Sequence, residues 1–228
     1  MKPALQGLYA LAALGVCGAS WATADFSGVW QAVDAPAALR TEQGALPPLL
    51  PQARQSYEAH LAARKAGDAS FDPTTQCQPP GTPRAYFMGM PFEIQQEQKD
   101  IYILFQWNRL FRVVDLGISH DQQNMYAPTF FGWSVGSWQQ DELVIDSVLF
   151  NDSTLLDAAG LPHSMDLHTI ERWRLSRDGQ RIDARITIED PASYAQPWSF
   201  RASFRRLPKG TEIQEDVCLE RLGLVPAH

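Results

Sequence analysis

The fold is decided by residues 181–205, which begin with RIDARITIE (181–189) and end with WSFRASFR (198–205). In both stretches apolar and polar residues alternate, and alternate residues of a strand point to opposite faces of its sheet. One face is therefore buried and the other is wet, which is typical of antiparallel sheets. The residues on the apolar face are Ile182, Ala184, Ile186, Ile188, Trp198, Phe200, Ala202 and Phe204.

Working outward, further stretches rich in β-branched and aromatic residues predict a meander of eight or more strands. These stretches are residues 26–30, 92–97, 100–107, 110–116, 142–149 and 166–176. Short turn signals at Gln98-Lys99, Asn108-Arg109 and Arg177-Asp178-Gly179 make neighbouring strands antiparallel. Such a meander closes most economically into a lipocalin-like β-barrel, because closure removes exposed edges, and two packed sheets are the alternative.

One helical arm is expected before the meander, at about residues 50–66. Pro51 suits a first helical position, long and apolar side chains recur at helical spacing, and Gly67 is a stop signal. Residues 68–91 contain five prolines and predict a loop. There is no internal repeat, so residues 25–228 are expected to form a single β-barrel domain with this helical arm.

Composition narrows the class of protein. The 228 residues include 19 Lys and Arg against 26 Asp and Glu, a net charge of −7, which is an ordinary globular composition. The excess of acidic residues gives no sign of the basic surface that binds nucleic acid. No stretch reaches the roughly 18 consecutive apolar residues of a membrane span. We therefore expect neither a nucleic-acid partner nor a membrane span, and the oligomeric state is left open.

The N-terminus has the pattern of a secretion signal. Lys2 is followed by an apolar run over residues 8–16 and by Ala22-Thr23-Ala24, an A-x-A cleavage site. Residues 1–24 are thus expected to be a signal peptide, and the mature protein to be periplasmic or secreted. Two cysteines remain after cleavage, Cys77 and Cys218; an oxidising compartment favours a disulfide between them over two free thiols.

Three residues are candidates for acid/base catalysis. Glu171 occupies the apolar face of its strand beside Trp173, where a carboxylate must be paired or protonated. Asp146 lies in a strand that is apolar on both faces and is expected to be buried. His163 lies on the loop before the Glu171 strand. Each has a structural alternative, namely a partner in the core for the two carboxylates and a surface loop position for His163.

The same part of the chain holds residues that could line a pocket: Arg172, Trp133, Trp138, Trp173 and His168. Strand alternation places His168 on the face opposite Glu171, so no metal site is expected, and no motif for a cofactor is present. Residues 132–136 match G-x-S-x-G, but no helix pattern follows, so the glycines are interpreted as permitting a bulge or a close approach of strands.

Several motifs together resemble a largely uncharacterised family of exported bacterial proteins. They are Cys77 to Arg84, the core motif G-x-S-x-G-x-W-x-x-D-x-L-V-[VI]-D over 132–146, Gly160 to Ser164, Glu171-Arg172 and Asp190 to Trp198. The sequence departs from this family at Trp133, where the family has histidine, and at Gln139-Gln140. The resemblance implies an exported, lipocalin-like barrel and supplies no activity.

Three functions remain open at this point. The first is a barrel that binds a small apolar or aromatic molecule. The second is a cofactor-free acid/base enzyme, an isomerase, hydratase or lyase, that uses Glu171, His163 and Asp146. The third is a structural or assembly factor with a filled barrel.

Overall fold

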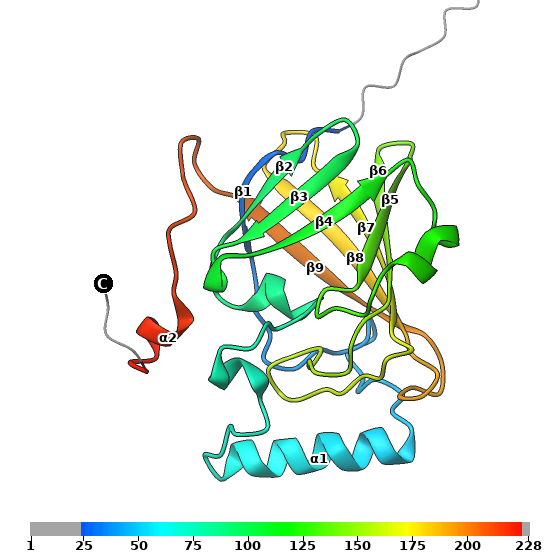
Figure 1. The fold of residues 1–228 in the computed structure, drawn as a ribbon, viewed down its shortest axis with the longest axis vertical. Coiled ribbons are helices and arrows are strands. Elements are labelled where there is room, and N and C mark those ends of the chain that lie inside the picture. Colours follow the sequence, from blue (N-terminus) through cyan, green and yellow to red (C-terminus); the bar gives the residue numbers. More distant parts are fainter. Residues whose placement is uncertain (1–23, 225–228) are drawn as a thin grey trace, which may run out of the picture.

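The computed structural model describes residues 24–224, and for residues 122–124 only the backbone. Nine strands form one closed barrel in chain order (Figure 1). This confirms the predicted mainly β, lipocalin-like barrel, while the predicted signal peptide lies outside the described residues except for Ala24. The strands are β1 (Gly28–Ala32), β2 (Phe92–Gln96), β3 (Asp100–Phe105), β4 (Leu110–Leu116), β5 (Trp133–Gln139), β6 (Glu142–Val148), β7 (His168–Leu175), β8 (Arg181–Glu189) and β9 (Trp198–Arg206).

Every pair of neighbouring strands is antiparallel except β4 and β5, which run parallel over three residues. The prediction of a purely antiparallel meander was therefore wrong at this seam, and β5 was not predicted as a strand. Parallel neighbours need a long connection, and residues 117–132 supply it. Gly136 permits the close approach, because a Cβ there would lie 2.6 Å from Leu116 Cδ2 and 2.8 Å from Val114 Cγ1.

The predicted helical arm is confirmed as α1 (Pro51–Lys65), which lies beyond one end of the barrel (Figure 1). His60 Nδ1 lies 2.7 Å from the carbonyl oxygen of Gly160, which ties the helix to the loop above it. The remaining helices are short: η1 (Pro73–Gln76), η2 (Arg84–Phe87), η3 (Trp107–Arg109), η4 (His120–Met125) and α2 (Cys218–Arg221). No helix of residues 24–224 is long and apolar enough to cross a membrane.

Aromatic rings fill the interior of the barrel. Tyr86 of η2 reaches the centre, and its ring centroid lies 5.4–5.5 Å from the centroids of Phe92, Phe105, Trp173 and Phe204. All five side chains are buried. The proline-rich segment that the sequence predicts as a loop therefore contributes the plug of the barrel.

The predicted disulfide is confirmed between Cys77 and Cys218. It joins the proline-rich segment to α2, at the end of the tail that follows β9. The tail is held beside it by Asp216, whose carboxylate accepts a 2.7 Å hydrogen bond from the backbone N–H of Asn108 in the β3–β4 turn. That turn has four residues, 106–109, where the sequence predicted a two-residue turn, and Asn108 and Arg109 in it both have positive φ, 51° and 53°.

Candidate functional site

Glu171 points into the lumen, as its alternation predicts, and has a partner there. Its Oε1 accepts a 2.6 Å hydrogen bond from Nη1 of Arg112 on β4, and its Oε2 accepts one of 3.0 Å from the indole of Trp173. Neither the carboxylate nor the guanidinium reaches solvent, with side-chain exposures of 0% and 1%. Glu171 is therefore a buried carboxylate with a partner in the core, which is the structural alternative to a catalytic role.

Arg112 uses its other donors as well. Nε donates to Ser134 Oγ (2.9 Å), Nη2 to Ser147 Oγ (2.8 Å) and Nη1 also to Tyr86 Oη (2.5 Å). Burial alone would lower the pKa of Arg112, but the Glu171 carboxylate and Tyr86 raise it above its usual range. Ser134 is the serine of the G-x-S-x-G match; it accepts hydrogen bonds from Arg112 and Ser147.

Sequence reasoning missed Arg112, although a signal was present. Arg112 alternates with Leu110, Val114 and Leu116, so it shares the inward face of β4. A lone arginine on an apolar face, with a lone glutamate on another, indicates a buried ion pair.

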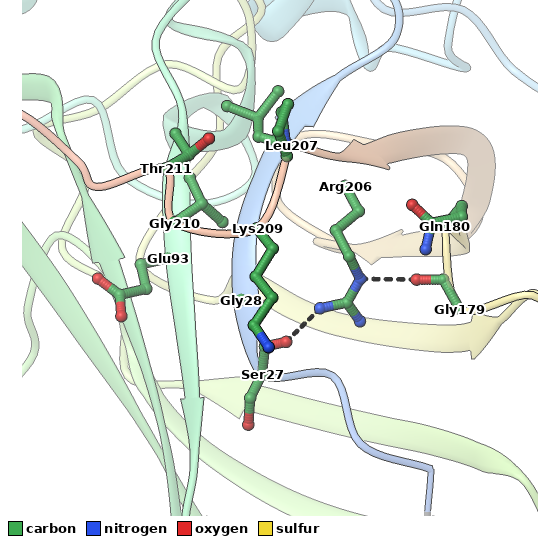
Figure 2. Close-up of a pocket in the computed structure, with 12 residues that line it drawn as sticks. Ser27, Gly28, Glu93, Gly179, Gln180, Arg206, Leu207, Lys209, Gly210 and Thr211 are labelled. Carbon is green, nitrogen blue, oxygen red and sulfur yellow. Dashed lines mark hydrogen bonds between the residues drawn. The ribbon is translucent and has the colours of Figure 1, made fainter.

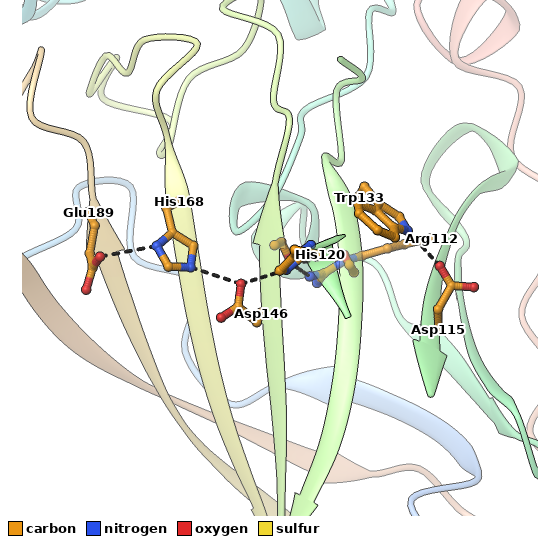
Figure 3. Close-up of polar contacts among 9 residues, drawn as sticks. Arg112, Asp115, His120, Trp133, Asp146, His168 and Glu189 are labelled. Atoms are coloured by element: carbon orange, nitrogen blue, oxygen red, sulfur yellow. Dashed lines mark hydrogen bonds and ion pairs between the residues drawn. The ribbon is translucent and has the colours of Figure 1, made fainter. Parts of the chain in front are cut away.

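Asp146 lies on the outer wall, so the expectation that it is buried was wrong: its side chain is 38% exposed. Its Oδ1 lies 2.8 Å from Nε2 of His120 and 2.9 Å from Nε2 of His168 (Figure 3). On the outer face of this strand, His120 of the segment between β4 and β5 reaches Asp146 but leaves it partly exposed; Tyr126 of the same segment stacks on Trp133 of the neighbouring β5 at 4.3 Å.

His168 completes this outer cluster, which consists of His120, Asp146, His168 and Glu189. Its Nδ1 lies 3.2 Å from Oε2 of Glu189, so both ring nitrogens face carboxylate oxygens. Only the imidazolium can donate to both, because carboxylates are acceptors. Accordingly the Asp146 hydrogen bond and charge raise the pKa of His168, while burial opposes them. Burial would raise the pKa of Asp146, but the two histidines lower it below its usual range.

These shifts predict a pH window for stability. The raised pKa of His168 stabilises the fold below about pH 6.5, and this contribution disappears as pH rises through the folded-state pKa. The lowered pKa of Asp146 stabilises the fold above about pH 3.9 and is lost as pH falls through its folded-state pKa. We therefore expect His168→Gln to flatten the decline in unfolding free energy above about pH 6.5, measured by urea titration across pH.

His163 provides a control of opposite sign. It is buried; its Nδ1 donates to the carbonyl oxygen of Ser164 (2.9 Å), and its Nε2 accepts from Thr154 Oγ1 (2.7 Å). Burial lowers its pKa, so protonation of His163 favours the unfolded chain, and the free energy of unfolding falls as pH drops below about 6.5. In His163→Gln the free energy of unfolding should therefore fall less as pH drops below about 6.5.

For His168→Gln, a dependence of the unfolding free energy on pH that equals that of the wild type would contradict the assignment of His168 as an imidazolium.

Two of the sequence motifs meet near His163. Asp190 accepts hydrogen bonds of 2.7 Å from both the backbone N–H and the hydroxyl of Ser164. The hydroxyl of Tyr194 donates to the carbonyl oxygen of Pro162 at 2.7 Å. The surroundings of His163 are thus a buried loop junction that these motifs hold together.

The five residues predicted to line a pocket do not gather in one place. Trp173 lies in the lumen, and Trp138 packs against the core beside Phe26 at a centroid distance of 5.8 Å. Arg172 lies outside and donates to Glu142 at 3.0 Å. Only Trp133 and His168 share a region, since the Trp133 ring packs edge-to-face on His120 of the outer cluster.

The outer surface also carries an open groove of about 760 Å³, between the start of β1, the β7–β8 turn and the chain after β9 (Figure 2). Lys209 and Glu93 face it. Arg206 on its wall is committed to the fold, because it donates to the carbonyl oxygens of Gly179 and Ser27 and covers the ring of Trp30. Apolar side chains, among them Val29, Leu207 and Pro208, line this groove together with the polar ones.

Across residues 24–224, no group of three or more His, Cys, Asp or Glu side chains is arranged to hold a metal ion. No protein-family model matches the chain, and no curated protein sequence matches it significantly.

Proposed function

We propose that the protein is an exported binding protein that works through the outer surface of a filled barrel. The observation that supports this most is the sealed Arg112–Glu171 ion pair at the centre of the lumen. A barrel that encloses a ligand needs a cavity of a few hundred Å³ lined mainly by apolar groups. Here the ion pair and the ring of Tyr86 occupy that space.

The other two functions expected from the sequence have less support. An enclosed apolar ligand would have to displace Tyr86 and cover a buried charge pair, which is costly. An acid/base enzyme that combines Glu171, His163 and Asp146 would need them in one site. They lie in the lumen, in a buried loop junction and on the outer wall, respectively.

Export is part of the proposal. It is supported by the signal pattern of residues 1–24 and by the Cys77–Cys218 disulfide, since disulfides persist in oxidising compartments. N-terminal sequencing of the protein from the extracytoplasmic fraction should begin at Asp25.

The test is titration with 1-aminoanthracene and with palmitate, two probes that enter apolar lumens, followed by fluorescence and by Tm. We expect no saturable signal and no rise in Tm. Binding at a hundredfold excess over Kd would stabilise the fold by about 2.7 kcal/mol, and that result would contradict a filled barrel. Tyr86→Ala is the matched control for a smaller probe, because removing the central ring opens a cavity of about benzene size beside the ion pair, so this variant should take up benzene while the wild type does not.

A further inference from the structure

A row of arginines crosses the outer wall of the barrel, where β7, β8 and β9 run side by side (Figure 1). The strand register places Arg172, Arg185 and Arg201 directly opposite one another. Their neighbours in sequence point into the lumen, so these three side chains point outward. Like charges placed directly opposite each other destabilise a sheet, which makes the arrangement unfavourable for folding alone.

Nearby carboxylates balance this row only in part. Arg185 and Arg201 share one carboxylate, that of Glu42, at 3.1 and 2.9 Å. Arg172 pairs with Glu142 at 3.0 Å. A guanidinium has five N–H donors, so each arginine keeps donors for a further anion.

The row forms one side of a hollow of about 400 Å³, which we call the arginine bowl. Five arginines and two carboxylates line it, and Glu42 and Asp141 pair with three of these arginines from outside the lining, which leaves a net charge of +1 in a chain whose overall charge is −7. Its charged lining residues are Arg172, Arg174, Arg181, Arg185, Arg201, Glu142 and Asp183. The bowl is therefore both concave and locally positive, as a site for an anion should be.

We propose that the arginine bowl binds a compact soluble polyanion that carries at least two phosphate groups. The inference rests on the proposed function, in which ligands bind to the outer wall. Each phosphate monoester carries about −1.5 to −2 charges and three acceptor oxygens, so two of them offer several acceptors to the N–H donors that Glu42 and Glu142 leave free on the three arginines of the row. The planar guanidinium fork matches phosphate oxygens in bidentate geometry.

The surroundings of the bowl favour a soluble ligand over a membrane surface. A peripheral membrane site combines basic residues with apolar side chains that enter the bilayer. Among the described residues, no large apolar side chain of β7, β8 or β9 is exposed. The available volume is also that of a small-molecule site.

The test is calorimetric titration of the full mature protein with inorganic tripolyphosphate. We expect saturable binding that weakens with added salt, and a loss of about tenfold in affinity in each of Arg185→Gln and Arg201→Gln. Arg109→Gln is the matched control, because Arg109 is also an exposed arginine paired with a carboxylate, Glu215, but lies outside the bowl. It should bind within about twofold of wild type.

Absence of binding, or equal losses in Arg109→Gln, would overturn the proposal. Citrate binding as tight as tripolyphosphate would overturn its phosphate part. Binding to phosphatidylglycerol vesicles, with phosphatidylcholine vesicles as reference, but not to tripolyphosphate would assign the bowl to a membrane surface instead. The apolar probes distinguish failure of this proposal from failure of the proposed function. If neither tripolyphosphate nor the apolar probes bind, the bowl proposal is wrong and the filled barrel stands. If the apolar probes bind saturably, the proposed function itself is wrong.

Discussion

Glu171→Gln is expected to lower the free energy of unfolding by about 3–5 kcal/mol. The substitution leaves Arg112 charged in the lumen without its counter-charge, and an arginine does not neutralise itself by losing a proton. The same loss is expected for Arg112→Met, which leaves the Glu171 carboxylate unpaired. Urea unfolding followed by circular dichroism measures both.

Two comparisons make this result specific. In the double variant Arg112→Met/Glu171→Gln no unpaired charge remains, so its loss should fall short of the sum of the single losses by about 1–3 kcal/mol. Glu142→Gln breaks the partly exposed ion pair with Arg172 on the outer wall and should cost less than about 1 kcal/mol. A loss below about 1 kcal/mol in Glu171→Gln would show that the lumen is hydrated.

Removal of the disulfide is expected to have the other large effect. Cys77 and Cys218 are separated by 141 residues, and closing a loop of that length restricts the unfolded chain by about 4–5 kcal/mol in the chain-entropy model. The variant Cys77→Ala/Cys218→Ala, or wild type with a reducing agent, should therefore unfold at a markedly lower Tm. The reducing agent should have no effect on the double variant, which serves as the control.

A thiol assay tests directly whether the Cys77–Cys218 disulfide is present in solution. Two thiols that react under native, non-reducing conditions would show that the bridge is absent from the protein in solution. A wild-type Tm that is indifferent to reducing agent would show that the tail after β9 is held by its other contacts, such as Asp216 to Asn108, without help from the bridge.

Local pattern predicted most of the barrel, because alternation records which face of a strand is buried. The two stretches within residues 181–205 and the helix from Pro51 to Lys65 were found in this way. The strand β5 was not predicted, because three of the four residues at its centre, Ser134 to Ser137, are serine or glycine and carry little strand signal. Their place in the sheet depends on the close packing of β4 against them.

Local sequence pattern did not predict which residues of the candidate site contact one another. Alternation identified Glu171 as unusual, but its partner Arg112 lies on a strand 59 residues earlier, and only barrel closure brings the two together. Asp146 was misplaced because its partners His120 and His168 lie 26 residues earlier and 22 residues later, outside the local pattern of its strand. The arginine row depends on strand register, so an acidic net charge concealed a positive face.

The indole N–H of Trp173 reports most directly on whether the lumen is sealed and filled. This proton is buried and donates to Glu171 at 3.0 Å. In a ¹⁵N-labelled sample transferred to D₂O, with the resonance assigned through Trp173→Phe, we expect its signal to persist for hours, since exchange requires opening of the barrel. Complete exchange within the first spectrum would show that water enters the lumen and would contradict a filled barrel.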